Sequence, residues 1–453
     1  MNCIFICIFN QIQYVEMFYL LLESILIHNK LDNTEILIYT STHFMNIIRQ
    51  NQLFDEKIIK FEINDEKNNI DEACKARLDL FNLFSIHRYD KVLYLDTDII
   101  VKGDVQPLFD LVQDEILYVL EEGEIDSDKD WWGKTLFGDE IHNYEDKTAF
   151  TSGILIFKNC EKIKNLFENI NKDMVLRYHY FNDQPFIVYN AFKYNLYNNK
   201  ILKSFVINND FNIESDIIIH HFSGNPGSYD HKMEKMNCFL FNIKDNMIYN
   251  HINKTKNFID NYLIHIIKNC DEPLEGNIFM FHQTTTYTDL FLNKAKNISN
   301  LVLNKNLKNV MEIGFNSGFS TLLMLISNPE IKITCFDLGE HKYTLPCYEK
   351  IKNLFDDRIE IIIGDSMKTL PLVDEKYDLI HIDGGHSKEV AESDILQSYR
   401  LSKDKTILIM DDYDFPELHE LWDQYIEKLN LHNLQIKLYS SPHHDIKYVL
   451  ENE

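Results

Sequence analysis

The chain has 453 residues, of which 45% are hydrophobic and 13% aromatic, so it can build two hydrophobic cores and is not a disordered protein. Its formal charge, 45 − 71 = −26, would repel nucleic acid and anionic membranes and argues against both as partners. The eight cysteines are dispersed and form no short metal-binding pair, no apolar run could span a bilayer, and residues 1–10 lack the basic segment of a signal peptide. We therefore expect a cytoplasmic protein with reduced cysteines; nothing in the sequence indicates an oligomeric state.

The first half alternates expected strands and helices. Strands are predicted at 3–9, 35–39, 57–61 and 92–95, and helices at 15–28 and 71–87. This alternation predicts a parallel α/β sheet, which binds ligands at the carboxyl ends of its strands.

The last of these strands ends in two aspartates, Asp96 and Asp98. On an extended chain their side chains would lean to one side and could hold a hard divalent cation. The alternative is a strand end with two solvated carboxylates.

Further motifs follow in a fixed order along the first half. They are Ala-Arg-Leu-Asp-Leu at 76–80, Lys-Val-Leu-Tyr-Leu-Asp-Thr-Asp at 91–98, Pro-Leu-Phe at 107–109, Phe-Thr-Ser-Gly-Ile-Leu-Ile-Phe at 150–157, Asp183-Gln184, and His-Phe-Ser-Gly at 221–224. This series resembles glycosyltransferase family 8. The resemblance implies a GT-A-type domain at 1–245 that transfers a hexose from a UDP-sugar to a glycan acceptor, with retention of configuration.

The resemblance also implies roles for individual residues. Asp96, Asp98 and His221 would hold Mn²⁺ or Mg²⁺ on the donor diphosphate. Arg77 would lie near the donor, Tyr14 would stack on the uracil, and Asp183 and Gln184 would be catalytic residues at the sugar.

Each role has a simpler alternative. Arg77 could pair with Asp79 on its own helix, Tyr14 could be an ordinary aromatic at a helix start, and Asp183 could cap a helix. One of His220 and His221 is expected only to pack, and the glycine in register favours His221 as the ligand.

The chain departs from the family pattern at two places. Thr151 replaces the usual Asn, and is followed by Ser152 and Gly153. The Lys-Pro-Trp that usually follows His-x-x-Gly is replaced by residues 225–229, so the lysine that faces the diphosphate is missing. Lys232 is a possible substitute, with no register to support it.

The second half begins after a polar, helix-like connector at 246–280, with a domain expected at 281–453. Strands are predicted at 310–313, 331–336, 359–363, 377–382 and 406–410, each ending in a glycine or an acid, and the tail is expected to add a helix and a strand or hairpin. Such strand ends are typical of a nucleotide-binding crevice.

The motif Glu312-x-Gly314-x-x-x-Gly318, followed by Asp337 and Asp365, resembles the class I S-adenosylmethionine methyltransferases, which have a Rossmann-like fold. The resemblance implies that Glu312 binds the cofactor and that the glycines admit its amino-acid end. Asp337 would hold its ribose and Asp365 would reach the adenine amine.

Residues 382–386 (Ile-Asp-Gly-Gly-His) and 410–413 (Met-Asp-Asp-Tyr) resemble the metal-dependent sugar O-methyltransferases. The resemblance implies that Asp383, Asp411 and Asp412 bind Mg²⁺, which would orient and acidify a substrate hydroxyl. We expect His386 to be the general base, because an imidazole titrates near neutral pH. His386 could instead cap the following helix, and the paired aspartates could form a solvated turn.

Together these features predict a bifunctional α/β enzyme in which one domain adds a sugar and the other methylates a sugar hydroxyl. The alternative is a carbohydrate-binding module that has lost glycosyl transfer, fused to an O-methyltransferase that acts on a small molecule.

Overall fold

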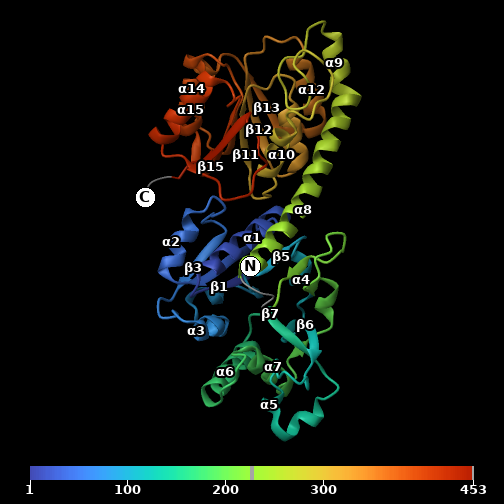
Figure 1. The fold of residues 1–453 in the computed structure, drawn as a ribbon, viewed down its shortest axis with the longest axis vertical. Coiled ribbons are helices and arrows are strands. Elements are labelled where there is room, and N and C mark those ends of the chain that lie inside the picture. Colours follow the sequence, from blue (N-terminus) through green and yellow to red (C-terminus); the bar gives the residue numbers. More distant parts are fainter. Residues whose placement is uncertain (225–228, 451–453) are drawn as a thin grey trace. The chain divides into compact units, whose positions relative to one another are not determined.

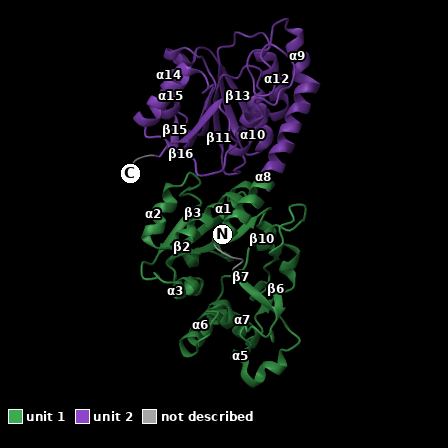
Figure 2. Cartoon of the chain, in the orientation of Figure 1, with its two compact units in different colours: residues 1–242 green, residues 243–453 purple. Residues whose placement is uncertain are grey.

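The computed structural model describes residues 1–224 and 229–450. It divides into two compact α/β units, Met1–Asn242 and Ile243–Glu453 (Figure 2). The expected fold class is confirmed, with a GT-A-type unit followed by a Rossmann-like unit.

The first unit is organised around a seven-stranded sheet with the order β3-β2-β1-β4-β7-β6-β8. Its strands are β1 (Asn2–Ile8), β2 (Thr34–Thr40), β3 (Ile59–Ile63), β4 (Lys91–Leu95), β6 (Leu117–Glu124), β7 (Thr148–Lys158) and β8 (Tyr197–Asn198). The strands β1 to β4 run parallel, whereas β7 is antiparallel to both β4 and β6. The predicted third strand was placed two residues too early.

Both faces of this sheet are covered by helices (Figure 1). Alternate residues of β1 point to opposite faces, so Ile4 and Ile6 join one core while Cys3 and Phe5 join the other. The first core includes residues of α1 (Ile12–His28), α2 (Thr42–Gln50) and α4 (Gln106–Leu111), and the second includes residues of α5 (Lys134–Phe137), α6 (Glu161–Leu176) and α7 (Gln184–Lys193).

The single helix expected at 71–87 was wrong. The chain forms a short α3 (Ile70–Lys75) and then 3₁₀ turns at Ala76–Asn82 and Phe84–Arg88. The buried residues Ala76, Leu78 and Leu80 recur at every second position. An α-helix cannot bury such a pattern on one face.

A small second sheet brings distant segments of the first unit together. In it β10 (Ile219–His221) lies between β5 (Ile99–Val101) and β9 (Val206–Asn208). The pairing places β10 beside the bend that joins β4 to β5.

The second unit contains another seven-stranded sheet, with the order β13-β12-β11-β14-β15-β17-β16. Its strands are β11 (Asn309–Ile313), β12 (Lys332–Asp337), β13 (Ile359–Ile363), β14 (Tyr377–Ile382), β15 (Ser402–Asp411), β16 (His432–Asn433) and β17 (His444–Tyr448). The strand β17 runs antiparallel to both of its neighbours, β15 and β16, whereas the other neighbouring strands of this sheet pair in parallel. The strand order reverses between β11 and β14, and open α/β sheets place their ligand crevice at such a point.

Helices also cover both faces of this second sheet. Figure 1 shows α14 (Lys388–Arg400) and α15 (Pro416–Lys428) on one face, with α10 (Leu292–Leu301) and α12 (Thr344–Phe355) on the other. The remaining helices are α8 (Tyr229–Phe258), the π-helical segment Ile259–Leu263, α9 (Ile264–Asn269), α11 (Phe319–Ser327) and α13 (Ser366–Thr369). Among the described residues, no helix is both long and apolar enough to cross a membrane.

Candidate active sites

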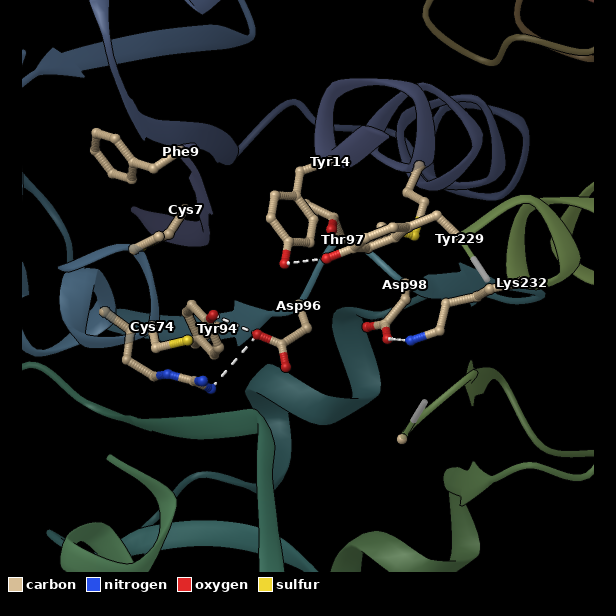
Figure 3. Close-up of a pocket in the computed structure, with 14 residues that line it drawn as sticks. Cys7, Phe9, Tyr14, Cys74, Tyr94, Asp96, Thr97, Asp98, Tyr229 and Lys232 are labelled. Atoms are coloured by element: carbon tan, nitrogen blue, oxygen red, sulfur yellow. Dashed lines mark hydrogen bonds and ion pairs between the residues drawn. The ribbon is translucent and has the colours of Figure 1, made fainter. Parts of the chain in front are cut away.

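The first unit has a cavity of about 530 Å³ at the carboxyl ends of β1 and β4 (Figure 3). Its lining residues are Cys7, Phe9, Tyr14, Met17, Ala73, Cys74, Arg77, Tyr94, Asp96, Thr97, Asp98, Gly224, Tyr229 and Lys232. Pockets of this size hold small ligands and cofactors.

The acidic motif lies at the edge of this cavity, but not on an extended strand. Asp96, Thr97 and Asp98 form the bend between β4 and β5, so the expectation of two strand carboxylates leaning together was wrong. The bend is tied to the partner strand β7, because the backbone N–H of Asp96 donates to Gly153 O at 2.9 Å. A Cβ atom on Gly153 would lie 2.8 Å from Asp96 Oδ2 and 2.5 Å from His221 Cε1, so only glycine leaves room for both groups.

His221 completes a cluster with the two aspartates. Each of the three residues offers a ligand atom, and these atoms all lie within 4.8 Å of one another. Carboxylate oxygens and an imidazole nitrogen suit Mn²⁺ and, through the carboxylates, Mg²⁺, so this donor set fits the ion that the resemblance implies.

The register of the small sheet explains why His221 occupies this position. His221 pairs with Ile99 on one side and with Asn208 on the other, and Nδ1 lies 2.9 Å from the Asn208 side-chain oxygen. That contact leaves Nε2 facing Asp98 Oδ1 at 3.3 Å. His220 packs its ring on Phe239 instead, at 4.6 Å between centroids.

The electrostatics of Asp98 follow from its neighbours. Burial raises the pKa of this carboxyl, but His221 and Lys232 outweigh it and hold the pKa below its usual range. Burial likewise lowers the pKa of His221, while Asp98 raises it above its usual value. Asp98 is therefore a carboxylate at neutral pH.

Arg77 connects the acidic bend to the proposed catalytic residues. Its guanidinium lies 2.8 Å from Asp183 Oδ2 and 3.4 Å from Asp96 Oδ1, donates to Ser152 O at 2.6 Å, and covers the Tyr94 ring at 4.9 Å. The helix-face alternative does not hold, because Arg77 makes these long-range ion pairs.

Asp183 and Gln184 start α7, and each side chain has a defined orientation. Asp183 occupies the N-cap position, yet its side chain makes no capping hydrogen bond and instead pairs with Arg77. The Gln184 carbonyl accepts from Ser152 N and Oγ, both at 3.2 Å, and its amide donates to Trp131 O at 3.3 Å. Ser152, which follows the departure from the family at Thr151, thus orients this amide.

Three side chains close the other side of the cavity (Figure 3). Tyr14, on α1, and Tyr229, at the start of α8, have their hydroxyls 3.0 Å apart and their rings edge to face. Lys232, one turn further along α8, lies with Nζ 2.6 Å from Asp98 Oδ2. Of the loop that departs from the family, residues 225–228 lie outside the described residues.

The candidate site of the second unit begins at the glycine turn after β11. Gly314 has φ +91°, and a Cβ there would lie 1.8 Å from Asp383 O. Gly318, with φ +75°, precedes α11. The Asp337 carboxylate accepts from Asn316 N and Gly339 N, both at 2.7 Å, and therefore braces this turn. A Cβ on Gly318 would lie 2.4 Å from the Phe315 ring, so both turns require glycine. We call these two glycine turns the cradle, the place to which the resemblance assigns the amino-acid end of S-adenosylmethionine.

Two of the expected cofactor contacts have other partners in this structure. Glu312 is fully buried, with Oε1 2.9 Å from His381 Nδ1 and a second bond from Thr321, so its carboxylate does not reach the crevice. The expectation that Glu312 binds the cofactor was therefore wrong, and its carboxylate instead bonds to His381 and Thr321. Asp365 caps α13 by accepting from Met367 N at 3.0 Å, and pairs with Lys368.

The three acids expected to bind Mg²⁺ line one small pocket with His386, but the close cluster of ligand atoms does not include Asp412. Asp383 and Asp411 cluster with His381, with their ligand atoms within 4.8 Å, whereas Asp412 Oδ2 lies 2.7 Å from His386 Nε2. Burial, and then Asp411, raises the pKa of Asp383 well above its usual value. Asp412 raises the pKa of His386.

His386 does not cap the following helix, because Ser387 does, accepting from Val390 N. The capping alternative is therefore excluded.

Sequence reasoning missed two residues of this second site. Lys294, on α10, is buried with Nζ 2.5 Å from Asp411 Oδ2, and His381 Nε2 lies 3.1 Å from the same oxygen. His381 could have been found, because it precedes Asp383 by two positions and so shares a side of β14. Lys294 had no such signal, since it sits in a polar helix before the first recognisable motif.

The comparisons with known proteins agree with this division. Residues 6–225 match the family model Glycosyl transferase family 8, and residues 311–413 match the model Methyltransferase domain. The resemblances to glycosyltransferase family 8 and to methyltransferases are confirmed: the chain is an enzyme with a glycosyltransferase domain and a methyltransferase domain. No curated protein sequence matches the chain.

Solved structures resemble each half at low identity. The galactosyltransferase LgtC, in complex with donor and acceptor sugar analogs, is 16% identical, with 52% of this chain and 96% of that chain covered and a TM-score of 0.39. The O-methyltransferase TomG from Streptomyces achromogenes, in complex with SAM, is 12% identical, with 34% and 78% covered and a TM-score of 0.29.

Proposed function

We propose that the first unit transfers a hexose from a UDP-sugar to a glycan acceptor, with a divalent metal and with retention of configuration. The observation that carries this proposal is the cluster of Asp96, Asp98 and His221 beside the Arg77–Asp183 pair, at one end of a nucleotide-sized cavity. A solvated strand end would not assemble five such groups from four separate segments.

Each group has a role in the proposed reaction. Bound at Asp96, Asp98 and His221, Mn²⁺ or Mg²⁺ would stabilise the charge that develops on the leaving diphosphate. Tyr14 lines the opposite wall and would pack on the uracil. Gln184 presents a fixed amide next to Asp183, at the place where the sugar face would lie, and Arg77 keeps Asp183 oriented.

The test measures release of UDP from a panel of UDP-sugars with Mn²⁺. We expect turnover that a chelator abolishes and that Asp98→Asn lowers by about 10²-fold or more, since one metal ligand is lost. A folded wild-type chain that binds UDP but cleaves no UDP-sugar would instead identify the unit as a carbohydrate-binding module.

For the second unit we propose methyl transfer from S-adenosylmethionine to a hydroxyl of a sugar. The cofactor would supply an electrophilic methyl group from the cradle at Gly314 and Gly318. Asp383 and Asp411 would hold Mg²⁺, and Asp412 orients His386 to accept the proton of the hydroxyl. The match of the first half to a glycosyltransferase family, and the resemblance of residues 382–386 and 410–413 to sugar O-methyltransferases, favour a sugar as the acceptor.

A methylation assay with radiolabelled cofactor tests this second proposal. Glycan products of the first unit should accept methyl groups in the presence of Mg²⁺, and His386→Gln should lower the rate by about 10²-fold. Methylation that persists with a chelator would remove the metal assignment, and methylation of small catechols but not of glycans would remove the sugar as acceptor.

A further inference from the structure

The first turn of α8 carries two residues into the donor cavity, beyond the end of the family match at residue 225. Tyr229 and Lys232 are three positions apart, so they share a face of the helix, and both line the cavity. Tyr229 meets Tyr14, and Lys232 meets Asp98 (Figure 3). The helix thus delivers a cation to a metal-ligand carboxylate.

The contact between Lys232 and Asp98 is a close and shielded ion pair. Nζ lies 2.6 Å from Oδ2, and the side chains are only 12% and 15% exposed. Ion pairs so placed are stronger than surface pairs, because solvent screens them less. A divalent ion that takes both aspartates must therefore compete with an ammonium group already at Asp98.

An ammonium group displaced from Asp98 needs a new anionic partner nearby. The leaving diphosphate of a nucleotide-sugar, which the metal would bridge, is such a partner. Two cations, Arg77 and Lys232, line the cavity, and Lys232 is the one that already lies at Asp98, so its ammonium group is placed to take such a partner.

We propose that Lys232 exchanges ion-pair partners. Its ammonium group pairs with Asp98 when the site is empty, and it binds the diphosphate of the donor when a metal ion occupies Asp98. This rests on the proposed function of the first unit. Because one cation serves both states, metal and diphosphate binding are positively coupled, and by linkage each tightens the other by the same factor.

The substitution Lys232→Met should change the affinities for Mn²⁺ and for UDP in opposite directions. Without nucleotide, Mn²⁺ should bind the variant about tenfold more tightly than the wild type, because Asp98 has lost its competitor. With saturating Mn²⁺, UDP should bind about tenfold more weakly, because the contact to the diphosphate is lost. The affinity for UMP, which lacks the second phosphate, should change less than that for UDP.

Isothermal titration of the full-length chain measures both affinities. Lys235→Met is the matched control, because it removes the same charge from the next turn of the helix, where Lys235 lies over the Phe211 ring at 5.9 Å. Lys232→Arg should restore UDP binding in part. General damage to the fold would weaken both ligands and cannot produce the opposite signs.

Two outcomes separate this inference from the function on which it rests. If the wild type binds no UDP with Mn²⁺, the proposed donor site itself is wrong. If the wild type binds UDP but Lys232→Met changes Mn²⁺ and UDP affinity in the same direction, or changes neither, the exchange of partners is overturned while the donor site stands.

Discussion

At the scale of single residues, Arg77 determines the electrostatics of the first site. Its guanidinium is 11% exposed and neutralises Asp183, whose side chain is 4% exposed. Burial raises the pKa of Asp183 even in the presence of Arg77, so this carboxylate depends on its partner to stay charged. Removing one member of a buried pair leaves an uncompensated charge.

Arg77→Met should therefore destabilise the first unit by about 3–5 kcal/mol, as expected for a broken buried pair. The double variant Arg77→Met/Asp183→Asn should recover part of this loss, since no unpaired charge remains. Urea unfolding of the three proteins measures the free energies. Additive losses in the double variant would show that the pair is not coupled.

A second residue, His251 on α8, makes the second unit sensitive to acid. Burial lowers its pKa from the usual 6.5 to about 4, with a smaller contribution from Lys254. The unfolded chain therefore binds a proton that the folded chain rejects. The contribution of neutral His251 to the free energy of unfolding is complete above pH 6.5 and is lost as the pH falls towards 4.

Between pH 7 and pH 5 this loss amounts to about 1–2 kcal/mol, allowing for partial exposure of the ring. His251→Gln should remove that part of the pH dependence. Calorimetry of both proteins at the two pH values gives the difference. Equal shifts on acidification would show that His251 is protonated in the folded protein.

At the scale of elements, the strand–turn–helix junction β11–α11 is the most constrained part of the second unit. Gly314 is in the left-handed region, where a side chain is strained, and has the carbonyl of Asp383 directly against it. That carbonyl belongs to the segment that ends β14. The turn and the β14 end are thus built in mutual contact.

Gly314→Ala should cost the second unit more than about 2 kcal/mol and abolish binding of S-adenosylhomocysteine, because the added methyl group separates the two strand ends. Gly276→Ala is the matched control, since nothing lies within 4 Å of a Cβ there and its φ is not positive. Thermal unfolding and titration with S-adenosylhomocysteine measure the two effects. Retained ligand binding by Gly314→Ala would remove the cradle assignment.

At the scale of the whole molecule, two compact units imply two cooperative transitions. Each unit has its own sheet, with helices on both faces, and its own candidate site. Calorimetry should therefore resolve two transitions.

UDP with Mn²⁺ should raise one transition, and S-adenosylhomocysteine should raise the other. A ligand at 100 times its Kd stabilises its unit by about 2.7 kcal/mol. One transition that responds equally to both ligands would show that the chain unfolds as a single cooperative unit.

The sequence predicted the order of the elements better than the contacts between them. Strand ends in glycine and acid identified both crevices, because hydrophobic period and turn residues are local signals. The pairing of His221 with Asp98 was available only by family resemblance, since it depends on β10 entering between β5 and β9. The positions of Lys294 and of the Lys232–Asp98 pair depend on tertiary packing alone, so no local sequence pattern predicts them. Glu312 was misjudged for the same reason, because its burial is set by His381 and Thr321.

Gly153 offers a practical consequence of the crowding around Asp96 and His221. Its neighbours are side chains rather than backbone, and its own φ is not in the left-handed region, so an added methyl group would displace the ligands without breaking the strand. Gly153→Ala is thus a way to silence sugar transfer while leaving the methyltransferase unit folded. Introduced into the chromosome, that one codon would remove the first activity without removing the second unit, which deleting the whole coding region cannot do.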